Sequence, residues 1–128
     1  MENKLMSIFV DVEKETAKRI DIIDDLDTFY ELLNCNTIDI VSRRIGSKRF
    51  DIICDDEGLL KGAPKISAID NLGSPQLVGN LLIVGTPDEE GDLTSLTEED
   101  ANYILSRVQH MCTRLYPEGY PMLTQVEY

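Results

Sequence analysis

The sequence predicts a single domain of the α+β class, in which two helices pack on a mixed, mainly antiparallel sheet. The chain has 128 residues, of which 42% are hydrophobic, and this suits one compact core. Apolar stretches of strand length follow one another through short polar turns, and two stretches of helical spacing interrupt them. The expected order of elements is therefore β-β-α-β-β-β-α.

The elements before residue 55 are predicted by two hairpin patterns and one capped helix. β-Branched residues in LMSIFVDVE (5–13) and TAKRIDII (16–23) favour strands that a polar link can join. Aspartates precede the helical spacing of DDLDTFYELLNCN, which predicts a helix over 26–34. The segments 37–45 and 48–54 flank Gly46-Ser47, and this predicts a second hairpin.

The later elements are a buried strand, a helix and a tail. QLVGNLLIVG (76–85) is the most apolar run, so we expect one central strand buried on both faces. Thr97 precedes three acids and a stretch of helical spacing, which predicts a capped helix over 98–115. The tail, 116–128, contains two prolines and is expected to dock loosely on a domain that spans 1–128.

Charge, cysteines and hydropathy narrow the functional classes. A net charge of -12 disfavours direct binding to a nucleic-acid backbone. Three widely spaced cysteines disfavour a disulfide framework and a structural zinc site. No apolar run approaches the length of a bilayer span, and the N-terminus lacks the pattern of a signal peptide. We therefore expect a cytoplasmic protein without membrane contact.

Two acidic stretches contain carboxylates of the kind that bind cations. Asp55-Asp56-Glu57 before Gly58 fits a turn better, because three consecutive side chains rarely converge on one ion. The loop 88–99 follows the spacing of a calcium loop, but Leu93 stands where the sharp turn requires glycine. We expect no metal site.

Signatures of catalysis are missing from the sequence. There is no Gly-x-Ser-x-Gly elbow, no His-Glu-x-x-His pair and no phosphate-binding glycine loop. His110 is the only histidine, and on the predicted helix it cannot face Cys112 two residues later. The sequence therefore predicts a protein that is not an enzyme and needs no cofactor.

One segment of this acidic chain is locally basic, since residues 41–65 hold six basic and four acidic side chains. Arginine and lysine bind phosphate, and neighbouring glycines let a ligand approach the backbone. The predicted ligand-binding residues, with two asparagines to hydrogen-bond a base or ribose, are Arg43, Arg44, Lys48, Arg49, Lys61, Lys65, Asn71 and Asn80. The candidate stacking partners are Phe50, Tyr103, Tyr116 and Tyr120. The alternative is a solvated hairpin end whose basic residues balance nearby acids.

Four segments, TIDIV, DIICDDEGLLKGAP, QLVGNLLIVG and GDLTSLTEED, occur in an order and spacing that resemble a known family. It is a family of small proteins of unknown function, common in tailed phages and in mobile elements of gut Firmicutes. Its typical pattern ends in a Leu-Pro-x-Asn-Arg-like segment. Residues 63–67 here lack that Asn and Arg, so a site formed by them in relatives is changed or uses Lys65. The resemblance implies an accessory protein of a phage or prophage.

Three hypotheses about function follow. The leading one is a non-enzymatic accessory protein that binds a small anionic, nucleotide-like ligand, with counter-defence by sequestering a signalling nucleotide. The second is an acidic inhibitor or DNA mimic that binds a host protein through Asp88, Glu89, Glu90, Asp92 and the acids of the first helix. The third is a structural or regulatory phage subunit without a ligand. We expect a homo-oligomer in each case, because the apolar strand needs cover on both faces.

Overall fold

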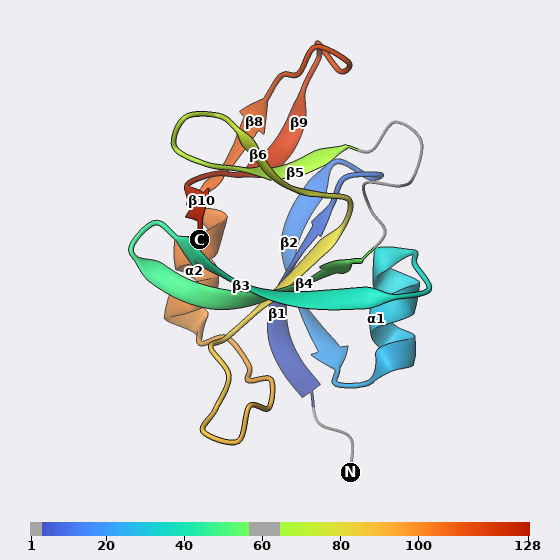
Figure 1. Ribbon diagram of the computed structural model, residues 1–128, viewed down its shortest axis with the longest axis vertical. Helices are drawn as coiled ribbons and strands as arrows, with labels where there is room; N and C mark the ends of the chain where they lie inside the picture. Colours follow the sequence, from blue (N-terminus) through green and yellow to red (C-terminus); the bar gives the residue numbers. More distant parts are fainter. Residues whose placement is uncertain (1–3, 57–64) are drawn as a thin grey trace.

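Ten strands and two helices make up the part of the chain that the computed structural model describes, residues 4–56 and 65–128 (Figure 1). The strands are β1 (Lys4–Asp11), β2 (Thr16–Ile23), β3 (Ile38–Ile45), β4 (Lys48–Asp55), β5 (Ile66–Ile69), β6 (Pro75–Val78), β7 (Leu81–Val84), β8 (Val108–Met111), β9 (Tyr120–Leu123) and β10 (Val126–Glu127). The helices are α1 (Leu26–Leu33) and α2 (Glu98–Leu105). The predicted α+β class with two helices is confirmed, whereas the predicted order of elements is wrong after β4.

The strands form two sheets instead of the single sheet that was predicted. The larger sheet has the order β10-β3-β4-β7-β1-β2, and all its neighbouring strands are antiparallel. The smaller sheet has the order β6-β5-β9-β8, in which β5 and β9 are parallel. The prediction of a mixed, mainly antiparallel arrangement is therefore confirmed.

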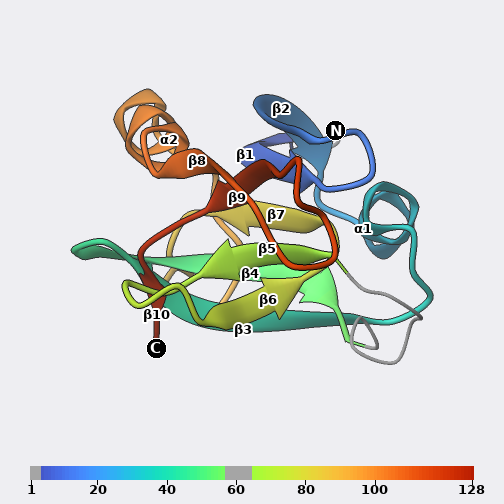
Figure 2. The same cartoon turned by 90° about the horizontal axis from the view of Figure 1, so that it is seen from above.

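Strand β7 lies at the centre of the larger sheet and is inaccessible to solvent along its length. Successive side chains of a strand point to opposite faces. Leu81 and Ile83 accordingly join a core beneath α2 and the smaller sheet, while Leu82 and Val84 join a second core with α1. The two helices lie on opposite sides of the larger sheet (Figures 1 and 2). Elements of the same chain thus cover both faces, so this strand no longer argues for an oligomer.

The apolar run at 76–85 is two strands, contrary to the prediction of one. Gly79 has a φ of 76° and donates its backbone N–H to Lys65 O at 2.8 Å, and here the chain leaves the smaller sheet for the larger one. The buried side chain of Asn80 accepts from Val12 N at 3.0 Å and donates to Leu32 O at 3.2 Å. Glycine permits this backbone conformation, and the asparagine satisfies two backbone groups at the junction.

Both helices begin as predicted, but α2 ends ten residues early. The Asp25 side chain accepts from Thr28 N at 2.7 Å, and the Thr97 side chain accepts from Asp100 N at 3.0 Å, so each helix has an N-cap. Residues 108–111 leave the helix because they pair with β9 as strand β8. Long-range pairing overrides the helical spacing, and His110 consequently lies on a strand. None of the described helices is long and apolar enough to cross a membrane.

The tail is an integral part of the fold, which corrects the expectation of loose docking. It supplies β9 to the smaller sheet and β10 to the edge of β3. Its buried side chains, with exposed fractions of 1% or less, are Tyr120, Met122, Leu123 and Val126. Strand alternation in short segments, one of which contains a proline, is a weak sequence signal, so only the pairing with distant strands reveals these elements.

Candidate functional site

The four basic residues of the β3–β4 hairpin do not converge on one pocket. Arg43 lies opposite Phe50, and Arg44 lies opposite Arg49. Consecutive strand residues point to opposite faces, so Arg44 and Arg49 share one face while Arg43 and Lys48 belong to the other. The sequence prediction grouped residues that the pleat of the sheet separates.

Contacts within the protein engage the arginines of this hairpin. The Arg43 guanidinium lies 4.2 Å from the centre of the Tyr128 ring, and Arg43 Nη1 donates to Ser42 O at 3.0 Å. Arg44 Nη2 forms an ion pair with Glu127 Oε2 at 2.9 Å. Arg49 Nη1 lies 3.3 Å from Ser42 Oγ. Arg44 is thus balanced by an acid of the chain, whereas Arg43 and Arg49 contact neutral groups.

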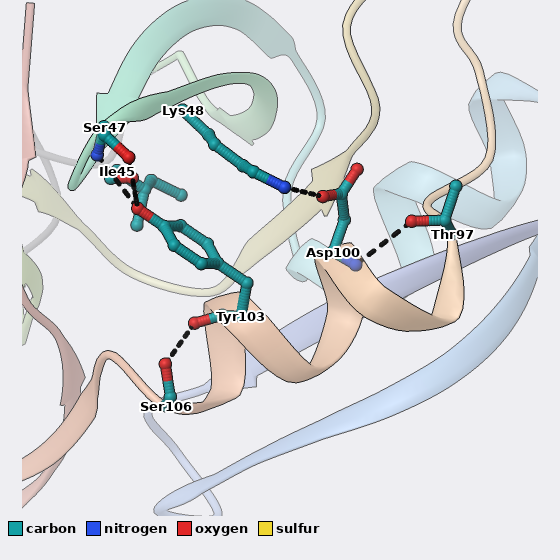
Figure 3. A network of polar contacts seen from close by, with 7 residues as sticks. All are labelled: Ile45, Ser47, Lys48, Thr97, Asp100, Tyr103 and Ser106. Atoms are coloured by element: carbon teal, nitrogen blue, oxygen red, sulfur yellow. Dashed lines mark hydrogen bonds and ion pairs between the residues drawn. The ribbon is translucent and has the colours of Figure 1, made fainter.

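Lys48 belongs to a network that fastens the hairpin turn to α2 (Figure 3). Its ammonium group forms an ion pair with Asp100 Oδ1 at 2.8 Å, and this hydrogen bond raises the pKa of Lys48. Tyr103 Oη accepts from Ser47 N and donates to Ile45 O, each at 2.9 Å. Hydrogen bonds from Ser47, its hydroxyl first, lower the pKa of Tyr103. This network indicates a structural role for Lys48 and Tyr103, because their side chains connect the hairpin turn to α2.

The two predicted asparagines also have partners inside the fold. Asn71 Nδ2 donates to Glu127 Oε1 at 2.9 Å, so Asn71 and Arg44 share one carboxylate beside a hollow of about 310 Å³. Asn80 is 7% exposed, and its side chain hydrogen-bonds the backbone of Val12 and Leu32. Lys61 lies outside the described residues. Beside this hollow Arg44 and Glu127 are thus paired with each other, and Asp70 accepts hydrogen bonds from Leu72 N and Ser74 N.

Lys65 occupies a different environment, in which it meets two of the predicted stacking partners. Its Nζ lies 4.9 Å from the centre of the Tyr116 ring and 5.3 Å from that of Tyr120. It donates to Val12 O at 3.2 Å and lies 3.9 Å from Glu15 Oε1. The ammonium is thereby held over two aromatic rings, at a point where β5, the β1–β2 link and the β8–β9 link meet.

A hollow of about 230 Å³ is formed beside these rings by the β8–β9 link and the first residue of β5. Its lining residues are Ile66, Thr113, Arg114, Leu115, Tyr116 and Tyr120. Mutual hydrogen bonds between Thr113 and Tyr116 shape the turn that carries Arg114. We call Lys65, Arg114, Tyr116 and Tyr120 the Lys65 site.

Tyr120 adds a buried hydroxyl to the Lys65 site. It is 1% exposed, and its Oη has no hydrogen-bond partner among the described residues, although the nearby Ile66 backbone acts to lower its pKa. Burial, followed by the neighbouring Tyr116, raises the pKa of Tyr120. The site therefore combines two cations, two rings and a neutral hydroxyl, which suits an anion that carries a flat group.

Sequence reasoning found three members of the Lys65 site and missed Arg114. Lys65 was predicted as a ligand residue, and Tyr116 and Tyr120 were predicted as stacking partners, but nothing in the sequence linked them. Arg114 stands in a turn, TRLYPEGY, that could have been recognised as a hairpin tip from its proline and glycine. The fold then places this tip beside the start of β5.

In the acidic loop between β7 and α2, an aspartate side chain hydrogen-bonds the backbone of its own loop. Asp88 Oδ1 accepts from Glu90 N and Asp92 N, each at 2.9 Å, so the loop that follows calcium spacing is organised by an aspartate turn. Glu57 and Gly58 of the other acidic turn lie outside the described residues. Across residues 4–56 and 65–128, no three His, Cys, Asp or Glu side chains are grouped to hold a metal ion.

This chain belongs to the family described as Domain of unknown function (DUF3846), whose model matches residues 5–109. The match confirms membership in a family of unknown function and covers most of the fold, including Lys65. No curated protein and no solved structure matches the chain.

Proposed function

We propose that this chain is a non-enzymatic binding protein that holds a small anionic, nucleotide-like ligand at the Lys65 site. The observation that carries the proposal is the position of Lys65 Nζ over the Tyr116 and Tyr120 rings, beside a hollow lined by Arg114. A cation and an aromatic face recognise two different parts of one nucleotide. The phosphate binds the positively charged groups, and the base stacks on the aromatic ring.

The polar contacts of Lys65 leave room for an anion. An ammonium group has three donors, and within residues 4–56 and 65–128 that of Lys65 makes one hydrogen bond, to Val12 O at 3.2 Å. Glu15 Oε1 lies at 3.9 Å, beyond hydrogen-bond range, so a phosphate oxygen can approach more closely than this carboxylate does. Arg114 is exposed and offers a planar fork for a second phosphate contact.

The size of the hollow limits the ligand. Its volume of about 230 Å³ lies below the ~300–1,000 Å³ of common small-molecule pockets. A ligand of mononucleotide size therefore lies partly in solvent, with its phosphate near Lys65 and its base against Tyr116. We further propose that the ligand is a nucleotide-derived signal of the host cytoplasm, sequestered by a phage-type accessory protein. The family resemblance in the sequence motifs supports this setting.

A binding experiment with a matched pair of arginine variants tests the proposal. Inorganic phosphate, nucleoside monophosphates and cyclic dinucleotides are first compared by thermal shift, and the strongest is titrated by calorimetry. Arg114→Ala is expected to weaken binding by about tenfold or more, because one charge-assisted contact is lost. Arg49→Ala removes another exposed arginine, from the hairpin, and should leave affinity unchanged. If none of these anions binds, or if the two variants behave alike, the proposal is wrong.

A second function is favoured by the acidic loop between β7 and α2. Asp88, Glu89, Glu90 and Asp92 are all exposed, and the loop projects from the body of the molecule (Figure 1). Such a loop suits an inhibitor or DNA mimic that binds a basic protein surface. Its complex would weaken steeply as salt rises, whereas a ligand at the partly buried Lys65 is screened less. A pull-down at low and high salt separates the two functions.

A further inference from the structure

The outer edge of β2 is unpaired along its whole length in the part of the chain described. β2 is the last strand of the larger sheet, and its other edge pairs with β1 without a break from Lys4↔Ile23 to Asp11↔Thr16. No bulge or proline interrupts these eight residues. Backbone N–H and C=O groups therefore face outward along the edge and are available to another strand. In Figure 2, β2 lies at the upper margin of the molecule.

The opposite edge of the same sheet is partly covered. There β10 pairs with Ile45 and Arg44 of β3, and the Tyr128 ring lies against the Arg43 guanidinium. The edge strands of the smaller sheet, β6 and β8, have four residues each. Among the described strands, β2 thus offers the longest uncovered edge for pairing.

We propose that two copies of this chain associate by antiparallel pairing of β2 with β2 of the partner, centred on Ile20. A two-fold axis that relates two such edge strands stands perpendicular to the sheet, so each face of one sheet continues into the same face of the other. In this register Ile20 meets its own symmetry mate. Arg19 lies directly opposite the partner's Asp21, and the symmetry repeats this pair on the other side.

The charges on β2 select this register over its neighbours. Centres at Lys18, Arg19 or Asp21 would each place a charged side chain opposite its own copy, which is unfavourable. The centre at Ile20 instead makes two opposite-charge pairs around an apolar one. Ile20 is half-buried and packs against the core beneath α1, so its symmetry mate extends that core across the interface.

Both members of the proposed ion pair are available for it. Asp21 is exposed, and its carboxylate makes no hydrogen bond or ion pair within the described residues. Arg19 is exposed, and its contacts are long, at 3.9 Å to Glu98 Oε1 and 3.4 Å to Asn102 Oδ1. These distances permit Arg19 to exchange its partners for a closer carboxylate. The interface is separate from the Lys65 site, so it does not depend on the proposed ligand.

Charge exchange on β2 tests the interface, with analytical ultracentrifugation of the full chain as the readout. The wild type is expected to sediment as a dimer of twice the 14.4 kDa chain mass at high concentration. Arg19→Asp sets acids against each other and should raise the dissociation constant by about tenfold or more. Asp21→Arg should do the same with two arginines. The double variant Arg19→Asp with Asp21→Arg restores opposite charges and should recover most of the affinity.

Two controls make the outcomes decisive. Circular dichroism establishes that each variant is folded, and recovery in the double variant separates a lost ion pair from a damaged monomer. Ile40→Lys places a charge on the exposed part of β3, at the other edge, and should leave the dimer intact. A wild type that stays monomeric, single variants that still dimerise, or a dimer that responds to Ile40→Lys alone would each overturn the proposal.

Discussion

Tyr103 accepts a hydrogen bond from the backbone N–H of Ser47 at 2.9 Å and donates one to the Ile45 carbonyl, so one hydroxyl of α2 holds both sides of the β3–β4 turn (Figure 3). Tyr103→Phe should lower the free energy of unfolding by about 1–3 kcal/mol, because two backbone groups lose their partner. Urea denaturation measures the effect. Tyr30→Phe removes a hydroxyl with no hydrogen bond in the described structure and should change stability little. Equal effects of the two variants would contradict this role.

The same turn requires glycine at position 46. Gly46 has a φ of 63°, and an added Cβ would collide with Tyr103 Oη. Gly46→Ala should therefore cost more than the ~1–2 kcal/mol of the left-handed backbone alone. Gly73→Ala is the matched control, because Gly73 has a φ of 81° but open space around it. We expect Gly46→Ala to lower thermal stability more than Gly73→Ala does. If the two losses are equal, or if the loss at position 46 is smaller, the proposed collision is wrong.

The wild-type protein, with aspartate at position 51, should be less stable at neutral pH than the Asp51→Asn variant. Burial raises the pKa of Asp51, so the folded chain holds this proton more tightly than the unfolded chain. The ionised carboxylate consequently lowers stability above the folded pKa, and the cost disappears as the pH falls below the unfolded value. Asp51→Asn is expected to stabilise the fold at pH 7, because the amide carries no charge to desolvate. The gain should shrink on acidification, as measured by urea denaturation at several pH values.

Asp39→Asn serves as the control for that titration, since Asp39 is an exposed carboxylate on the neighbouring strand. It should not reproduce the pH-dependent gain. A constant gain for Asp51→Asn across the pH range would show that lost packing or hydrogen bonding, and not ionisation, sets its effect.

Cys54 should resist alkylation in the folded protein. Burial, together with the nearby Asp39, raises the pKa of its thiol to about 11, and its Sγ lies 3.6 Å from Asp39 O. At pH 8 only about 0.1% of such a thiol is ionised. Iodoacetamide followed by mass spectrometry should label the exposed Cys112 first. In urea both should react at similar rates, and rapid labelling of Cys54 without urea would show that the core opens.

Leu123 tests whether the C-terminal strand is part of the core. It is fully buried in β9, so Leu123→Ala should destabilise the protein by about 2–5 kcal/mol. Leu115→Ala makes the same truncation at a side chain that is 72% exposed, and its effect on the urea midpoint should be small. Similar urea midpoints for Leu123→Ala and Leu115→Ala would instead support a loosely docked tail.

Local patterns predicted the first half of the fold well, because its interactions are close in sequence. The predicted strand at 16–23 and the hairpin around Gly46 match β2 and β3–β4, and Asp25 caps α1 as expected. Predictions failed where distant pairing decides the outcome. The helix after Thr97 ends at Leu105 because β8 pairs with β9, and no local signal marks that change.

The same contrast between local sequence and distant contacts applies to the candidate site. Lys65, Tyr116 and Tyr120 were each singled out from residue type, since cations and rings have recognisable chemistry. Their meeting depends on β5 lying parallel to β9, which brings a lysine and a hairpin tip from distant parts of the chain together. The basic residues of the β3–β4 hairpin do not share one face of the sheet, because strand pleating separates consecutive residues such as Arg43 and Arg44.

The sequence by itself determined the α+β class, the helix caps, the two N-terminal hairpins and the apolar strand at the centre, because periodicity and short-range hydrogen bonds specify them. The tertiary structure alone decided that Gly79 divides the apolar run between two sheets, that the tail completes both sheets, and that Lys65 meets two tyrosines. These features depend on free energies of packing and pairing between segments far apart in the chain, which residue patterns within one segment do not contain.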